Sequence, residues 1–194
     1  MDRRTIYTIN VVKDAFLDLI SEKSYPEINV AMICRKADIT RSTFYLHFDN
    51  LTDVLNAVLD DALLFTGESS FTIDPAKVSL DVLKENESLL PACQRIADSQ
   101  KYRDLLMDSS LSDYIIGRII AHERDTIVPS IQKRAGLNEK EAELLFIYSI
   151  HGSFAINKRH HFTKDDSWYK DLQMFNKFTS AGYKALKKTE TMDD

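Results

Sequence analysis

The apolar positions along the chain recur with the spacing of helices. Near the N-terminus a single face with the spacing i, i+3, i+4, i+7 and i+8 consists of Val12, Ala15, Phe16, Leu19 and Ile20. A cap residue at Asn29 predicts a second helix, and one at Thr40 predicts a third over residues 41–48. The sequence has no sustained alternation of the strand type. These patterns predict an all-α fold.

Further helices are predicted along the rest of the chain. Asn50 and Asp53 resemble a capping box that opens a fourth helix, about residues 51–66. Thr, Gly, Ser, Asp and Pro cluster within residues 65–77, which predicts a loop and a seam in the chain. The later helical patterns cover roughly residues 78–98, 100–134, 138–160 and 168–187, with kinks or breaks expected at two prolines, Pro91 and Pro129.

The stretch from Ala37 to Asn50 places hydroxyls and a guanidinium directly before an aromatic run. Two short helices joined by a short turn, with a longer helix behind them, form a helix-turn-helix unit. The second helix of such a unit lies in the major groove of DNA. There Thr40 and Ser42 supply hydroxyl donors, and Arg41 supplies a charged group for guanine or phosphate.

The remaining residues of this stretch divide between two sides of the helix. Tyr45 and His47 are placed to reach the DNA backbone from its flank, whereas Ile39, Phe44 and Phe48 form an inward face. A plain helical hairpin with a capped second helix has the same spacing and stays open as an alternative. The charge balance favours it, since the first 49 residues hold seven basic and seven acidic side chains and DNA-binding modules are usually more basic.

Residues 9–59 resemble the N-terminal DNA-binding domain of the TetR family of bacterial repressors. Besides the apolar face of the first helix, the matching positions are Tyr25, Ile33, Ala37, Thr40, Arg41, Thr43, Phe44, Tyr45, His47, Phe48 and Leu55. The resemblance implies a helix-turn-helix DNA-binding domain over residues 1–50 and a helical regulatory and dimerisation domain over residues 51–194, with the helix at 51–66 connecting them. It implies DNA contacts from Thr40, Arg41, Ser42, Thr43, Tyr45 and His47.

Three positions depart from the family pattern. Asp38 stands where the turn usually has Gly, so an Asp must adopt a backbone angle that suits Gly. Leu51 replaces a Lys that commonly binds phosphate at the start of the fourth helix, and Ser24 replaces another usual Gly. The missing Lys and the balanced charge of the first 49 residues favour an alternative function. This alternative is a TetR-like coactivator or protein-interaction module with weak or no direct DNA binding.

The resemblance also implies partners. It implies a repressor that binds a palindromic double-stranded DNA operator as a homodimer and is released by a small-molecule effector, which the sequence does not identify. We expect a largely apolar effector pocket, for which the candidate lining residues are Tyr102, Met107, Tyr114, Phe146 and Tyr148. The stretch "SQKYRDLL", residues 99–106, also resembles a subgroup with regulators and coactivators of dihydroxyacetone kinase operons.

Two C-terminal helical faces predict the dimer interface. The first face, with small residues in its middle that admit a close partner helix, consists of Leu145, Ser149, Gly152, Ser153 and Ile156. The matching stripe of the last helix consists of Leu172, Phe175, Thr179, Gly182, Tyr183 and Leu186. Two such helices from each of two subunits form a four-helix bundle. Packing of both faces within one chain is the alternative.

Composition narrows the classes of partner and site. The net charge of −5 means that any nucleic-acid surface has to be local. The two cysteines, Cys34 and Cys93, fall in apolar patterns and are expected to be small buried hydrophobes. The chain begins without the apolar run of a signal peptide and holds no stretch of about 18 uncharged apolar residues. We therefore expect a cytoplasmic protein without a membrane partner.

Enzymatic and metal sites have little support in the sequence. The run from His160 to Asp166 holds two histidines and two aspartates, but it lies in a polar bend, which favours a solvated loop over a metal site. No Gly-rich phosphate loop and no G-x-S-x-G motif occurs, and nothing orients His151 for catalysis. We expect no cofactor, no metal and no enzymatic activity.

Overall fold

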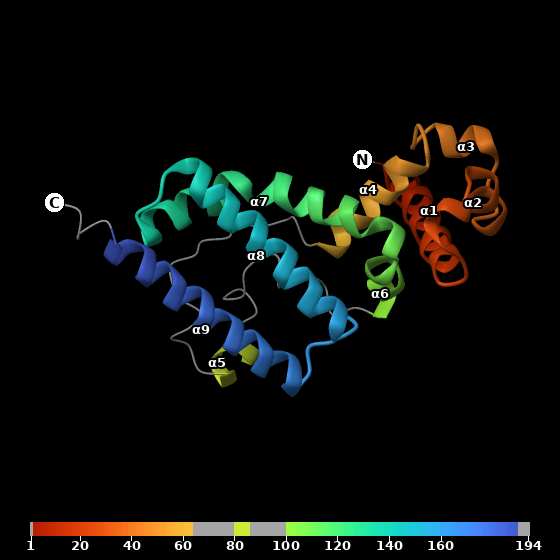
Figure 1. Ribbon diagram of the computed structural model, residues 1–194. Coiled ribbons are helices and arrows are strands. Elements are labelled where there is room, and N and C mark those ends of the chain that lie inside the picture. The colour runs from red at the N-terminus through yellow and green to blue at the C-terminus, as the bar shows by residue number, and fades with distance from the viewer. Residues whose placement is uncertain (1, 64–79, 86–99, 190–194) are drawn as a thin grey trace. The chain divides into compact units, whose positions relative to one another are not determined.

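The computed structural model describes residues 2–63, 80–85 and 100–189, and all elements in these ranges are helical (Figure 1). The α-helices are α1 (Arg3–Ile20), α2 (Val30–Lys36), α3 (Arg41–Tyr45), α4 (Leu51–Ala62), α5 (Leu80–Glu85), α6 (Gln100–Met107), α7 (Ser112–Ala135), α8 (Glu139–Arg159) and α9 (Asp166–Thr189). The same ranges contain two short 3₁₀ helices, η1 (Tyr25–Glu27) and η5 (Ser109–Leu111). The predicted all-α fold is confirmed.

The chain divides into two compact units. Unit 1 contains Met1–Leu63 and Ser99–Ile115, and unit 2 contains Leu64–Asp98 and Ile116–Asp194. The division falls within α7, after its first turn. The functional boundary expected near residue 50 stays a prediction, because this division reflects packing and places α4 and α6 with α1.

Unit 1 is organised around α1, which packs against α2, α4 and α6. Its core contains fully buried side chains from each of these helices and from α3, among them Phe16, Ile33, Phe44, Leu59 and Leu105. The backbone N–H of Tyr25 donates a hydrogen bond to the Asp108 carboxylate, with an N···O distance of 2.8 Å. This bond joins η1 to the end of α6, segments that are 83 residues apart in the chain.

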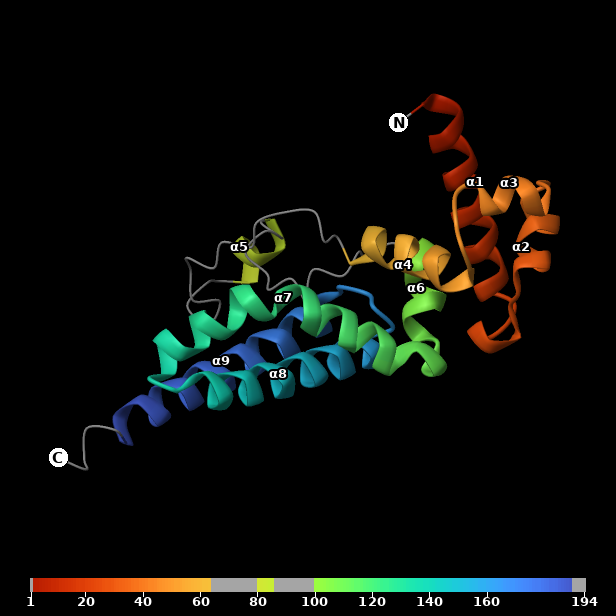
Figure 2. The same ribbon diagram turned by 90° about the horizontal axis from the view of Figure 1, so that it is seen from above.

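In unit 2, α7, α8 and α9 run alongside one another in both views (Figures 1 and 2). Arg124 on α7 donates hydrogen bonds to Glu143 at 2.7 Å and to Glu139 at 2.9 Å on α8. A Cβ at Gly152 on α8 would lie 3.6 Å from the ring of Phe175 on α9. Gly152 therefore lies at the contact between α8 and α9 within one chain, where a Cβ would make an ordinary van der Waals contact.

Several helix limits differ from the sequence-based expectations. The expected helix over residues 100–134 is two helices, because the Asp108 carboxylate accepts the Ser110 N–H and starts η5 between them. Pro129 lies inside α7 and does not end it. The third helix ends at Tyr45, and α4 ends at Ala62. The expected loop at 65–77, Pro91 and Cys93 lie outside the described residues, whereas Cys34 is buried as predicted.

Candidate nucleic-acid interface

The start of α3 is fixed by short-range hydrogen bonds. The Oγ1 atom of Thr40 accepts a hydrogen bond from the Thr43 N–H, with an N···O distance of 3.1 Å, which confirms the predicted cap. The preceding Asp38 has φ 51°, in the left-handed region that favours Gly and that Asp tolerates better than most residues. The backbone angle expected at this turn is therefore present, and Asp38 adopts it in place of Gly.

The inward side of α3 is anchored by aromatic residues. Phe44 is fully buried and Phe48 nearly so, and their ring centroids lie 5.7 Å apart. Burial of a phenylalanine of this size contributes about 1.5–3 kcal/mol, which is ample to hold a helix of five residues in place. The predicted inward face of the stretch is thus the one that packs on the domain core.

The outward side of α3 carries polar groups with open hydrogen-bonding capacity. Arg41 and Ser42 are exposed, Tyr45 is 55% exposed, and no side-chain hydrogen bond joins any of them to another described residue. Thr43 and His47 are half-buried. The hydroxyls of Thr40 and Thr43 lie 2.9 Å apart and already satisfy each other, so Thr40 serves chiefly as a cap.

The sequence pattern did not predict one exposed residue of this surface. Leu46, the C-cap of α3, is 78% exposed, more than any other large apolar side chain of the described residues. The sequence does contain a signal, because Leu46 follows Ser42 by four positions and residues so spaced share a helix face. The exposed face of α3 therefore consists of Arg41, Ser42, Tyr45 and Leu46.

The basic side chains of the N-terminal region fall into two groups, those that form ion pairs and those that do not. Lys13 pairs with Asp61 at 2.7 Å, and Lys36 pairs with Glu22 at 2.8 Å, an interaction that lowers the pKa of the Glu22 carboxyl and raises that of the Lys36 ammonium. The basic side chains without an ion pair to another described residue are Arg3, Arg4, Lys23, Arg35 and Arg41. Cations therefore remain available to an anionic partner although the sum of charges is zero.

The candidate pocket residues are divided between the two units. Tyr102, Met107 and Tyr114 belong to unit 1, where the Tyr114 hydroxyl donates a hydrogen bond to Asn56 at 2.6 Å. In unit 2 the side chains of Phe146 and Tyr148 point to different sides of α8, since they are 1% and 60% exposed. The effector pocket stays a prediction.

The candidate dimer residues lie at and beside the contact between α8 and α9. Ser153 and Tyr183 are buried within the chain, whereas Gly182 is exposed. The half-buried members of the two predicted faces are Leu145, Ser149, Gly152, Ile156, Phe175 and Thr179. Part of these faces therefore packs within one chain, which was the alternative for this surface. The dimer interface itself stays a prediction.

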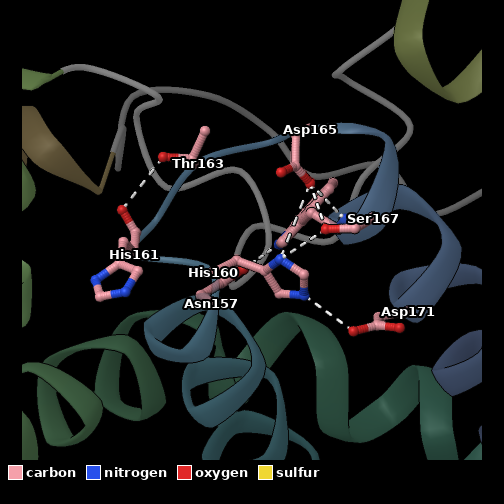
Figure 3. Close-up of polar contacts among 8 residues, drawn as sticks. Asn157, His160, His161, Thr163, Asp165, Ser167 and Asp171 are labelled. Atoms are coloured by element: carbon pink, nitrogen blue, oxygen red, sulfur yellow. Dashed lines mark hydrogen bonds and ion pairs between the residues drawn. The ribbon is translucent and has the colours of Figure 1, made fainter.

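The histidine–aspartate bend between α8 and α9 forms a local network (Figure 3). His160 Nε2 lies 2.9 Å from Asp171 Oδ2, and the side chain of His160 is only 11% exposed. Asp165 accepts the Trp168 N–H at 2.8 Å and thereby caps α9, a hydrogen bond that lowers the pKa of the Asp165 carboxyl. His160 is thus part of a packed bend rather than a solvated loop, whereas His161 is exposed.

The described residues were also compared with the geometry of metal sites and of membrane-spanning helices. Among residues 2–63, 80–85 and 100–189, no group of three or more His, Cys, Asp or Glu side chains is arranged to hold a metal ion. In those ranges, too, no helix combines the length and the apolar character needed to cross a membrane.

The geometry of α1, α2 and α3 defines a helix-turn-helix domain, in which a short capped helix packs on a longer one and exposes its polar face. Residues 14–58 match the family model for bacterial regulatory proteins of the tetR family. The predicted resemblance of residues 9–59 to that family's DNA-binding domain is confirmed over this range.

Two curated relatives have similar sequences. One is an uncharacterized HTH-type transcriptional regulator, YxbF, of Bacillus subtilis (strain 168), 30% identical over 100 residues, which are 47% of this chain and 26% of the relative. The other is the HTH-type dhaKLM operon transcriptional activator DhaS of Lactococcus lactis subsp. lactis (strain IL1403), 32% identical over 59 residues. That similarity covers 30% of this chain and 32% of the relative, so the chain spans about a third or less of either relative's length.

Proposed function

We propose that this protein is a transcriptional regulator of the TetR type, which binds a palindromic operator as a homodimer and represses transcription until a small-molecule effector releases it. The observation that carries the proposal is the exposed face of α3. Its polar groups are free, and its other side is anchored by the buried Phe44 within a domain that matches the family. Arg41 is suited to guanine or phosphate, and the Tyr45 hydroxyl to a phosphate oxygen.

Dimerisation would let two copies of α3 act together. In a dimer of helix-turn-helix domains the two helices enter successive major grooves about 34–36 Å apart, so the operator is a palindrome. Unit 2 offers an apolar surface for this purpose. Its large exposed apolar side chains, which extend along the same side of α8 and α9, are Leu144, Ile147, Tyr148, Met174 and Phe178.

The direction of these residues follows from the packing of α8 and α9. The two antiparallel helices meet at Gly152 and Phe175, and both bury the same flank of that contact through Phe146 on α8 and Leu172 on α9. The exposed apolar residues lie on the opposite flank. We place the homodimer interface there, beside the predicted faces and continuous with their half-buried members.

Release by an effector is a question of relative affinity. A ligand weakens DNA binding only if it binds the conformation that does not fit the operator more tightly than the one that does. The helical domain that follows α4 is the proposed place for such a ligand. Identification of the effector requires a screen, for which the released operator is the readout.

Selection of bound sequences from random duplex DNA tests the proposal. We expect the wild-type protein to enrich a palindrome with half-sites one helical turn apart, and we expect Arg41→Ala to reduce this enrichment. Lys170→Ala, which removes an exposed cation on α9, is the matched control and should enrich the same palindrome. If the wild-type protein enriches no sequence, the operator-binding function is wrong.

A second candidate function is that of a coactivator or protein-interaction module. It is favoured by Leu51, which is half-buried at the first position of α4 and cannot bind phosphate where the family usually has Lys. The Lactococcus lactis relative is named as a transcriptional activator, which also favours a positive role. Deletion of the gene separates the two outcomes, since transcription of target genes rises if the protein represses them and falls if it activates them.

A further inference from the structure

Leu46 occupies an unusual position for an aliphatic residue. It is the most exposed of the large apolar side chains in the described ranges, at 78%. Its backbone angles, φ −74° and ψ −17°, continue the right-handed course of α3, so its side chain follows the helix face of Ser42. Leu46 is therefore an apolar group within an otherwise polar surface.

The neighbours of Leu46 identify the surface to which it belongs. Arg41, Ser42 and Tyr45 are exposed on the same face of α3, whereas Phe44 and Phe48 are buried on the other. A single leucine among polar groups is too small an apolar patch to attract a protein surface. The occupant must therefore be a partner that presents small apolar groups between polar ones.

The major groove of DNA has this character at one base. Thymine presents its C5 methyl group beside hydrogen-bonding atoms, and cytosine lacks the methyl. Leu46 has no donor or acceptor, so it can distinguish bases only by apolar contact and shape. We propose that Leu46 is a specificity-determining residue that contacts the C5 methyl group of a thymine in each half-site. This inference rests on the proposed operator-binding function.

The assignment gives the residues of α3 different tasks. Arg41 and Ser42 recognise hydrogen-bonding edges or phosphates, and Tyr45 binds the backbone. Leu46 adds a contact that is insensitive to hydrogen bonding and confined to one base. Loss of this contact should change the preference at one position of the half-site and leave the other positions unchanged.

Replacement of thymine by deoxyuridine tests the proposal, because it removes the methyl group and keeps the hydrogen-bonding pattern of the base. In the palindrome selected by the wild-type protein, each thymine is replaced in turn, symmetrically in both half-sites. At one position we expect wild-type affinity to fall about fourfold per half-site, as for loss of one buried methyl-sized group, and roughly fifteenfold for the dimer.

Two variants of the full chain make the result specific to Leu46. Leu46→Ala should bind thymine and deoxyuridine duplexes within about twofold of each other at that position, because the methyl no longer has a partner. Leu46→Met, which keeps an apolar side chain of similar volume, should retain the sensitivity. Circular dichroism checks that both variants fold, which is expected for an exposed residue.

The outcomes separate this inference from the function on which it rests. An enriched palindrome in which no deoxyuridine weakens wild-type binding overturns the role of Leu46 and leaves operator binding intact. The same holds if wild type and Leu46→Ala lose equal affinity at every position. Failure to select any operator overturns the proposed function itself, and the inference with it.

Discussion

The exposed face of α3 and the exposed flank of the α8–α9 pair differ in chemistry. The first presents a guanidinium, a hydroxyl and a phenol around one leucine, on a helix of five residues. The second presents large apolar side chains along two helices of 21 and 24 residues. Polar, sparsely apolar surfaces suit a hydrated and reversible partner such as DNA. Extended apolar surfaces suit a lasting association between protein chains.

The largest expected effect concerns the anchoring of α3. Phe44→Ala should destabilise the protein by about 3–5 kcal/mol, because it leaves a cavity under the helix. Tyr45→Ala, at the neighbouring exposed position, should cost much less and is the matched control. Chemical denaturation followed by circular dichroism measures both. Equal losses for the two variants would contradict the separation of an anchored side from a binding side.

A second prediction tests the apolar flank. Phe178→Glu should weaken dimerisation by about 2–4 kcal/mol, since it places a charge in the centre of a desolvated interface. Lys177→Glu, which alters an exposed neighbour on α9 outside the apolar flank, should leave the dimer intact. Sedimentation velocity over a range of protein concentrations measures the shift toward monomer. A dimer that persists in Phe178→Glu would place the interface elsewhere.

A third prediction concerns Arg41. Arg41→Ala should cost about 1–3 kcal/mol on the selected operator and relax the preference at one position per half-site, if the guanidinium binds a base edge. Tyr45→Phe should weaken binding to all sequences alike, by about 0.5–1.5 kcal/mol, if the hydroxyl binds only phosphate. Titrations against operator and scrambled duplexes at several salt concentrations compare them. Equal and weak binding of all sequences by wild type and variants would favour the coactivator.

The two regions also differ in how much of their structure could be predicted. The caps at Asn29 and Thr40 could be predicted because each depends on a hydrogen bond between residues three positions apart. The Asn50 cap could be predicted for the same reason. The capping box is not completed, because the Asp53 carboxylate accepts the N–H of Asp49 instead of the N–H of Asn50. Asp38 was correctly expected to adopt a left-handed angle.

The faces of α8 and α9 could not be assigned in the same way. Both helices carry apolar residues on the side toward the core, on the side toward each other and on the exposed flank. Periodicity alone does not rank these sides, since burial depends on contacts that are distant in the chain. Gly152 illustrates this, because its face was predicted to meet a second subunit, with packing inside one chain as the alternative, and in the structure Gly152 lies beside Phe175 of the same chain.

The smallest effect is expected from surface ion pairs, of which each unit has an example. In unit 2 the Lys84 ammonium donates a hydrogen bond to Asp166 at 2.6 Å and links α5 to α9. This bond lowers the pKa of the Asp166 carboxyl and raises that of the Lys84 ammonium. Because the folded-state pKa of Asp166 is lowered, its contribution to the free energy of unfolding is present above the unfolded-state pKa. This contribution is lost as the pH falls through the folded-state pKa.

Lys84 sets the other limit of this pH window. Its pKa is raised, so its contribution is complete below the unfolded-state pKa and is lost as the pH rises through the higher folded-state value. Because the acid limit comes from Asp166, Asp166→Asn should reduce the dependence of unfolding on pH in the acid range. Asp104→Asn, which removes an exposed carboxylate on α6, is the control. Hydrogen exchange of the α5 amides measures how far the Lys84–Asp166 pair stabilises this helix. It is followed between pH 2 and pH 6, a range that brackets the ordinary carboxyl pKa of about 4. If wild type and Asp166→Asn show the same pH dependence of exchange in α5, the pair does not hold this helix, and the apolar contacts of unit 2 suffice.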